Sequence, residues 1–351
     1  MAIRLGASIP SSRQLVLNFL LCTLLPLPNY AQTSSPPADD RWREAGLPYI
    51  QSYSASEYGG DQQNWDIVQD RRGVMYFANQ NCLLEYDGVT WRQIYTGDRL
   101  SVRSVAIDSS GRLWMGAALE IGYFLPDAVG NLQYTSLLSY IPAHLREVAE
   151  YWRVAVTSQG VYFQSRDILL RWLEKSNTMK ICLSETGFSD FFVFEDTLYI
   201  RKSGIGLMKM TGDSLRLIPG GERFADLEVS AVLPYFNSEQ TAGAAFGDSF
   251  APVPGNAHKA IRRQWLAVSA TRGLFLYDGV AFQPFTTTAD TMLLRANVLC
   301  GAVLADGSYA LGTRNYGLLI IDRQGNLRRI LDMTAGLPGS SVYHSYVDSK
   351  G

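Results

Sequence analysis

The chain has 351 residues, of which 47% are hydrophobic and 18% are charged, and its formal net charge is −2. This length allows a sizeable hydrophobic core, and the near-neutral charge gives no support for nucleic-acid binding, which requires a basic face. Glycine (31) and tyrosine (19) are abundant, and segments with helical periodicity are scarce. The composition therefore indicates an all-β protein.

The first 31 residues have the features of a secretory signal peptide. Arg4 and Arg13 form a positive region, Leu15–Leu27 is apolar, and the small residue Ala31 precedes the expected cleavage point. The apolar run is shorter than the roughly 20 residues that a membrane span needs. We therefore predict export and a mature N-terminus near Gln32, with an uncleaved anchor as the alternative.

Residues 32–45 form a polar, proline-rich linker that we expect to be disordered. Three cysteines follow it, Cys82, Cys182 and Cys300, far apart in the sequence and each beside apolar residues. An odd number at such spacing does not describe a disulfide framework, and no C-x-x-C motif is present. We expect these cysteines to behave as small buried hydrophobic residues without a zinc or redox role.

Residues 46–351 repeat one pattern: an apolar run, a D-x-x-G turn, a second apolar run and often DGV before an aromatic residue. The stretch WDIVQDRRGVMYFANQNCLLEYDGVTW starts at Trp65, and RSVAIDSSGRLWMG starts at Arg103. ADGSYALG, from Ala305, and GLFLYDGVAF, from Gly273, repeat parts of it. A repeat of about 40 to 50 residues with this pattern is typical of one four-stranded blade of a β-propeller.

In chain order the pattern predicts six blades, which begin near Trp65, Val102, Trp152, Phe188, Val229 and Asn297. Residues 237–263, rich in glycine, alanine, proline and serine, are expected to be an exposed insertion in blade five. The last stretch, GLPGSSVYHSYVDSKG, opens another blade. We therefore expect a seven-bladed propeller, incomplete in this chain, and a full-length protein that continues beyond Gly351.

Turn-plus-strand pieces such as DSSGRLWMG and DGSYALGTRNYGLLIID resemble two-component regulator propeller repeats, and residues 46–91 are similar to the first blade of bacterial sensors of that family. The resemblance covers about residues 46–351, although blades three and four lack the LWxGT core. It implies a periplasmic sensor propeller. In such proteins a triple-tyrosine domain, a transmembrane helix and a cytoplasmic kinase, helix-turn-helix regulator or cyclase follow. This chain contains none of those output domains, and a homodimer is compatible with the family.

The sequence contains few motifs that indicate catalysis or metal binding. His144, His258 and His344 lack metal-binding spacing, and no G-x-S-x-G motif or phosphate loop occurs. The aspartates of the D-x-x-G turns are interpreted as turn formers rather than calcium ligands. We therefore predict no catalytic residue, no metal and no cofactor. A polysaccharide lyase or hydrolase, with carboxylates from different blades, and a protein-binding scaffold are the alternatives to a sensor.

One periodic feature predicts a ligand site. Eight residues before the turn glycine stand Trp65, Arg103 and Trp152, with Leu299 and Tyr343 at the same position in later repeats. These residues start the innermost strands beside the axial channel, where propellers bind ligands. Aromatic faces suit sugar rings, and arginine suits carboxylate or sulfate, so we predict that Trp65, Arg103 and Trp152 contact the ligand. The family resemblance implies that this ligand is a saccharide. The alternative is that these large residues plug the channel or pack between blades.

A second periodic set lies about three residues after the turn and is uniformly large and apolar: Tyr76, Trp114, Phe163 and Tyr199. We predict that these residues form the core between blades.

Overall fold

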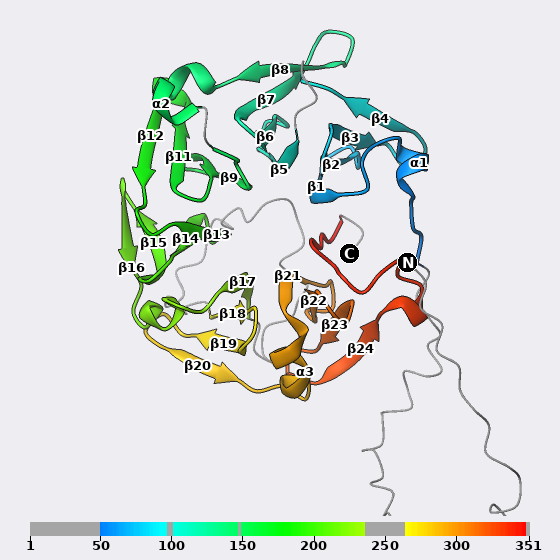
Figure 1. Cartoon of the computed structure of the whole chain (residues 1–351), viewed down its shortest axis with the longest axis vertical. Coiled ribbons are helices and arrows are strands. Elements are labelled where there is room, and N and C mark those ends of the chain that lie inside the picture. The colour runs from blue at the N-terminus through cyan, green and yellow to red at the C-terminus, as the bar shows by residue number, and fades with distance from the viewer. Residues whose placement is uncertain (1–49, 97–100, 147–148, 236–263, 349–351) are drawn as a thin grey trace, which may run out of the picture. The chain divides into compact units, whose positions relative to one another are not determined.

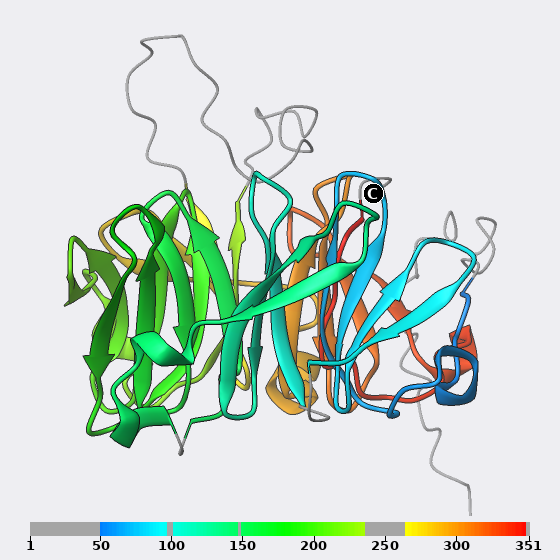
Figure 2. The same ribbon diagram turned by 90° about the horizontal axis from the view of Figure 1, so that it is seen from above.

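The computed structural model of the protein describes residues 50–96, 101–146, 149–235 and 264–348. Within these ranges the chain forms six four-stranded antiparallel sheets around an axis (Figure 1). Figure 2, turned by 90°, shows that the strands of each sheet run between the two faces of the ring. The predicted all-β propeller is confirmed. The predicted signal peptide, linker and blade-five insertion lie outside the described residues.

Each blade contributes one strand to each of four positions, from the axis outward. The inner strands are β1 (Asn64–Gln69), β5 (Val102–Ile107), β9 (Arg153–Thr157), β13 (Phe188–Phe194), β17 (Val229–Pro234) and β21 (Val298–Val303). The second strands are β2 (Met75–Asn79), β6 (Leu113–Ala117), β10 (Gly160–Gln164), β14 (Thr197–Lys202), β18 (Trp265–Ser269) and β22 (Tyr309–Thr313). The blade starts predicted from the sequence lie within one residue of the first residue of each inner strand.

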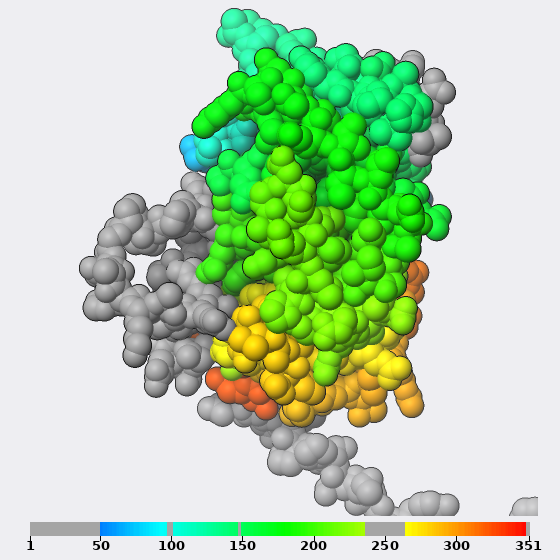
Figure 3. All heavy atoms as spheres, turned by 90° about the vertical axis from the view of Figure 1, so that its left-hand side faces the viewer, coloured from blue at the N-terminus to red at the C-terminus, as the bar shows by residue number. Residues whose placement is uncertain are grey.

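The third and fourth strands complete the sheets toward the perimeter. The third strands are β3 (Leu83–Tyr86), β7 (Glu120–Pro126), β11 (Ile168–Leu173), β15 (Gly206–Thr211), β19 (Gly273–Tyr277) and β23 (Leu318–Ile321). The outer strands are β4 (Trp91–Ile94), β8 (Leu132–Ser136), β12 (Thr178–Leu183), β16 (Ser214–Leu217), β20 (Phe282–Phe285) and β24 (Leu327–Leu331). Figure 3 shows the side of the ring on which the side chains of blades three, four and five meet.

Short helices occupy connections between blades. They are α1 (Ala55–Tyr58), α2 (Ala143–Arg146) and α3 (Asp290–Ala296), together with the 3₁₀ turns η2 (Leu138–Tyr140), η3 (Glu174–Ser176), η4 (Gly221–Phe224) and η6 (Met333–Ala335). The sequence pattern did not predict α3, whose Leu293 and Ala296 are fully buried in the core between blades five and six. No helix within the described ranges has the length and hydropathy needed to cross a membrane.

The D-x-x-G aspartates act as turn formers, as predicted. In blade two, Asp108 Oδ1 accepts hydrogen bonds from the backbone N–H groups of Ser110 (2.9 Å) and Arg112 (3.0 Å). In blade one, Asp70 Oδ1 accepts from the corresponding N–H groups of Arg72 (2.8 Å) and Val74 (3.0 Å). Because the carboxylate satisfies two backbone donors, the turn is fixed without a ligand.

The predicted inter-blade core is present. Trp114 and Phe163 are 1% and 0% exposed, and their rings lie 6.3 Å apart in an edge-on arrangement across the interface between blades two and three. Tyr76 is also buried, and burial raises its pKa to about 12. Tyr199 is half-buried and its ring lies 5.4 Å from that of Trp265. Each blade thus covers its apolar face with the next blade.

The seventh blade is the part of the fold prediction that the structure does not show. Residues 340–348 form no strand, although in Figure 1 this stretch lies between blade six and β1. Its backbone meets blade six as the start of blade three meets blade two. The N–H of Val342 donates to the carbonyl of Thr313 (2.9 Å), just as the N–H of Tyr151 donates to the carbonyl of Ala117 (3.1 Å).

Candidate functional site

Two of the three predicted site residues, Trp65 and Arg103, stand at irregular points in the sheets. In five blades the pairing register between the inner and second strands shifts near the start of the inner strand. In four of these blades the shift passes over a single residue of the inner strand: Trp65, Arg103, Ser230 or Leu299. A β-bulge leaves such a residue out of the ladder and re-aims its side chain. Trp152 differs, because it precedes β9, whose pairing with β10 is regular.

The structure brings the three predicted site residues into one contact group, here called the Trp–Arg–Trp cluster (Trp65, Arg103 and Trp152). The Arg103 guanidinium carbon lies 4.8 Å from the ring centroid of Trp65 and 4.5 Å from that of Trp152. The two indole rings lie 5.5 Å apart at 80° to each other. Three consecutive blades therefore supply one cation–π group. Such contacts contribute up to about 2 kcal/mol when the cation is desolvated.

The polar ends of this cluster are bound by the protein itself. Gln80 Oε1 accepts hydrogen bonds from Arg103 Nη1 (2.7 Å) and from the indole N–H of Trp65 (3.0 Å). Arg103 Nη2 lies 3.5 Å from Glu150 Oε1. Arg103 is only 8% exposed, so its guanidinium holds the two tryptophans and has little surface left for a ligand. A ligand's carboxylate or sulfate would have to displace Gln80 or Glu150 to reach this guanidinium.

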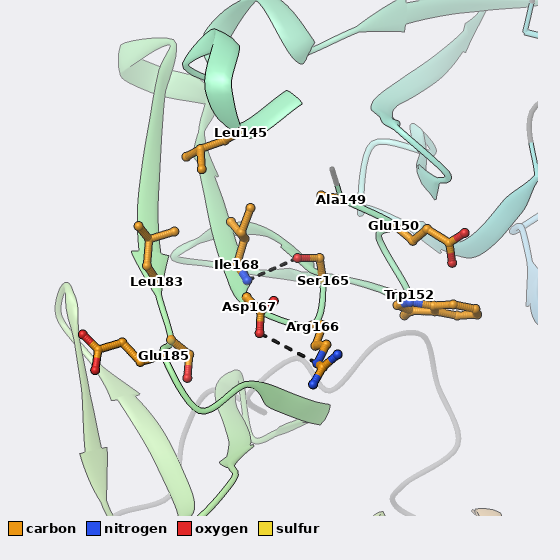
Figure 4. Close-up of a pocket in the computed structure, with 11 residues that line it drawn as sticks. Leu145, Ala149, Glu150, Trp152, Ser165, Arg166, Asp167, Ile168, Leu183 and Glu185 are labelled. Atoms are coloured by element: carbon orange, nitrogen blue, oxygen red, sulfur yellow. Dashed lines mark hydrogen bonds and ion pairs between the residues drawn. The ribbon is translucent and has the colours of Figure 1, made fainter. Parts of the chain in front are cut away.

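Trp152 is the member of the cluster that reaches open space. It is 37% exposed and lines a cavity of about 640 Å³ beside blade three. Figure 4 shows Trp152 and Glu150 on one side of this cavity and Leu145, Ile168 and Leu183 on the other. The volume falls within the roughly 300 to 1,000 Å³ of typical small-molecule sites.

The rest of the cavity wall is polar and comes from two connecting segments. Ser165, Arg166 and Asp167 belong to the turn between β10 and β11, and Glu185 follows β12. Arg166 Nε lies 4.0 Å from Asp167 Oδ1, and both side chains are exposed. The backbone N–H of Ile168 donates to Ser165 Oγ (3.2 Å), which holds the turn. Sequence reasoning missed these residues because connecting segments carry no periodic signal.

A second cavity, of about 260 Å³, lies in the axial channel and is lined by the inner strands of successive blades. Its polar residues stand one position after the predicted site residues. Ser104 Oγ donates to Asp66 Oδ2 (2.5 Å), and His344 Nε2 lies 3.2 Å from Asp66 Oδ1. Arg153 forms a salt bridge with Asp190 at 3.2 Å, and that carboxylate raises the arginine's pKa. The channel interior thus holds two paired polar groups, Asp66 with Ser104 and His344, and Arg153 with Asp190.

His344, for which the sequence established only that it lacks metal-binding spacing, faces Asp66 in this channel. Burial lowers its pKa below the ordinary value, despite the attraction of the Asp66 carboxylate. Its position could have been found, because His344 stands seven residues before Gly351 as Asp66 stands seven before Gly73. Of the other histidines, His144 is exposed and His258 lies outside the described residues. The described residues contain no cluster of histidine, cysteine and carboxylate groups arranged to hold a metal.

Comparison with known proteins gives a likeness of fold. No protein-family profile and no curated protein matches this chain. The extracellular domain of the hybrid two component system BT3049 from B. thetaiotaomicron matches with a TM-score of 0.57 and 13% identity, over 86% of this chain and 40% of that chain. The extracellular domain of the hybrid two component system BT4673 from the same organism matches with a TM-score of 0.57 and 14% identity, over 81% of this chain and 36% of that chain. Virginiamycin B lyase from Staphylococcus aureus matches with a TM-score of 0.50 and 9% identity, over 78% of this chain and 84% of that chain.

These identities are too low to carry a function from one protein to another. This chain also spans well under half the length of the two B. thetaiotaomicron chains. The protein is a β-propeller, six-bladed in its described residues, that is structurally similar to the extracellular domains of hybrid two-component systems.

Proposed function

We propose that this chain is the ligand-sensing propeller of an extracytoplasmic signalling receptor and that its ligand is a saccharide. The observation that carries the proposal is the open face of Trp152, which Arg103 and Trp65 hold in place at the edge of a 640 Å³ cavity. A fixed aromatic face beside hydroxyl and carboxylate groups suits a sugar ring, which has both apolar and polar sides.

The receptor role rests on the resemblance of the repeats and on the likeness to extracellular domains of two-component systems. In this proposal residues 1–31 direct export to the periplasm, and a transmembrane segment and a cytoplasmic output domain belong to the full-length protein. Residues 340–348 would then be the inner strand of a seventh blade. The bond from Val342 to Thr313, which repeats the bond from Tyr151 to Ala117, supports that assignment.

The test is calorimetric titration of the exported chain with a panel of neutral, acidic and basic oligosaccharides. We expect the Trp152→Ala variant to bind the best ligand about five- to thirty-fold more weakly than wild type, because stacking contributes about 1 to 2 kcal/mol. Tyr95→Ala is the matched control, since Tyr95 is an aromatic residue of blade one that is 44% exposed and outside the cavity. Equal binding by the wild type and both variants would place the ligand elsewhere.

A second function, a propeller lyase, is favoured by one observation. His344 and Asp66 form an imidazole–carboxylate pair in the axial channel, and such a pair can act as a general base. Among the matching structures is a catalytically inactive histidine-to-alanine variant of virginiamycin B lyase. A lyase would release unsaturated products from a polysaccharide or cyclic peptide, and His344→Ala would abolish that release. The sensor proposal expects no turnover from the wild-type chain.

A further inference from the structure

The charged residues around the cavity beside Trp152 indicate whether its ligand is acidic, neutral or cationic. The positive charge nearest to Trp152 is that of Arg103, but this guanidinium is enclosed by two indole rings and bound by Gln80 and Glu150. A sugar carboxylate or sulfate would have to displace one of those partners to reach it. Arg103 therefore already has an acidic partner in Glu150 at 3.5 Å, and its Nε, which has no hydrogen-bond partner among the described residues, is buried.

The cavity wall itself is acidic. Among the described residues that line it, Glu150, Asp167 and Glu185 supply three carboxylates and Arg166, 4.0 Å from Asp167, supplies the one guanidinium. The Glu150 side chain is 43% exposed even though it also faces Arg103. An anionic ligand would meet net repulsion in this space, whereas a cationic ligand would be attracted.

The indole ring of Trp152 in the cavity wall also favours a positively charged ligand. The face of an indole ring carries negative potential and attracts a cation placed above it. The cluster already uses this property, since one face of Trp152 is taken by Arg103 at 4.5 Å. Glu150 stands beside the exposed part of the ring, whereas Glu185 lies on the opposite side of the cavity with its side chain directed away from Trp152 (Figure 4).

We propose that the ligand of this cavity is an amino sugar with a free, protonated amine, held against Trp152 with its ammonium group directed toward Glu150. The proposal rests on the saccharide-sensing function above and specifies its substrate class. The ring of the sugar supplies the apolar face, and the amine supplies the charge that the cavity lacks.

The probes are three oligosaccharides of matched length: a glucosamine oligomer with free amines, its N-acetylated form and an oligogalacturonate. They are titrated by calorimetry in mildly acidic buffer, in which the sugar amine is protonated. We expect the amine form to bind at least about ten-fold more tightly than the N-acetylated form, and the acidic oligomer to bind most weakly. Added salt should weaken the amine form most, because its attraction to the cavity is electrostatic.

Two variants locate the charge. Glu150→Gln, which keeps an oxygen that can accept from Arg103, should weaken binding of the amine form about three- to ten-fold and leave the N-acetylated form unchanged. Glu222→Gln, which changes an exposed glutamate outside the cavity, should change neither. Thermal melting of each variant checks that the fold is intact.

The outcomes separate this inference from the function on which it rests. If the neutral or acidic oligomer binds as tightly as the amine form and Trp152→Ala still weakens it, the charge inference is wrong and the saccharide site stands. If none of the oligosaccharides binds in a Trp152-dependent way, both fail. If a lysine-rich peptide binds in the cavity more tightly than the amino sugar, the charge is right and the sugar class is wrong.

Discussion

Two arginines of blade two each lie over a pair of aromatic rings, and the two groups behave differently. Arg112 lies 5.1 Å from the ring centroid of Trp114 and 4.8 Å from that of Tyr123. Arg103 lies 4.8 Å and 4.5 Å from the centroids of Trp65 and Trp152. Trp114 is 1% exposed, whereas Trp152 is 37% exposed. Both groups are cation–π contacts of an arginine with two aromatic rings. They differ in the burial of the tryptophan, since Trp114 is buried and Trp152 is partly exposed.

That difference separates a structural role from a binding role. The indole N–H of Trp114 donates to Asp108 Oδ2 (3.0 Å), and its ring packs against Phe163 of the next blade, so the protein uses the whole side chain. Trp152 uses only part of its surface in the cluster and leaves the rest at a cavity. An aromatic residue at the start of an inner strand is therefore informative only after its exposure is known.

The largest expected effect is that of Trp114→Ala. Removing a fully buried tryptophan leaves a cavity between blades two and three and costs about 3 to 5 kcal/mol of unfolding free energy. Denaturant unfolding of the wild type and the variant measures it. Trp152→Ala serves as the comparison and should cost about 1 kcal/mol or less, because its ring is partly exposed. Similar losses in both variants would show that the distinction between the two groups is wrong.

The second effect tests whether Arg103 positions the cluster. Arg103→Ala removes the cation–π contacts of a buried guanidinium with two indole rings and its hydrogen bond to Gln80, whose oxygen keeps only the indole N–H of Trp65 as a donor. We expect a loss of about 2 to 3 kcal/mol. Arg103→Lys should recover little of it, because an ammonium group cannot present a planar face to both indole rings.

A readout beyond stability separates positioning from simple packing. Both Arg103 variants should also weaken ligand binding, since Trp152 loses the group that holds its ring in place. The near-ultraviolet circular dichroism of the tryptophans should change with them. If binding and the tryptophan signal stay as in wild type while stability falls, Arg103 has no positioning role.

Much of the fold could be predicted from the sequence, because the blade pattern is local. A turn aspartate such as Asp108 bonds its own backbone, and alternating apolar residues define each strand, so each repeat reports its own structure. Trp65, Arg103 and Trp152 were found for the same reason, since one position in every repeat starts the inner strand. Their mutual contact follows from the order of the blades around the axis.

The cavity and the state of its charges could not be predicted in this way. The cavity depends on Asp167 and Glu185, which lie in connections without a repeat and meet only in the folded blade. The enclosure of Arg103 depends on Gln80, twenty-three positions earlier, whose role no local pattern indicates. The seventh blade was inferred from one strand-like stretch, and a single inner strand has no partner strands in the described chain with which to form a sheet.

The smallest expected effect is on the pH dependence of stability, which should differ between the Trp114 group and the channel beside the Trp–Arg–Trp cluster. Burial alone would raise the pKa of Asp108, but hydrogen bonds from Ser110 and Trp114 outweigh it and lower the pKa below the ordinary 3.8. Its contribution to stability is therefore present above pH 3.8 and is lost only as the pH falls through the lower, folded-state value. The Trp114 group should not respond to mild acid.

His344, in the channel next to the Trp–Arg–Trp cluster, should respond earlier. Burial lowers its pKa below the ordinary 6.5, so the unfolded chain takes up a proton before the folded chain does. Stability is thus unaffected above pH 6.5 and declines as the pH falls below it. The geometry agrees, because His344 Nε2 faces Asp66 while the buried Nδ1 finds no acceptor within the described residues, so a second proton would be left unpaired.

In His344→Gln the side chain keeps a donor for Asp66 and cannot titrate. Denaturant unfolding at a series of pH values from above 6.5 down to about 5 should show the wild type losing stability relative to His344→Gln, and parallel curves would contradict the assignment.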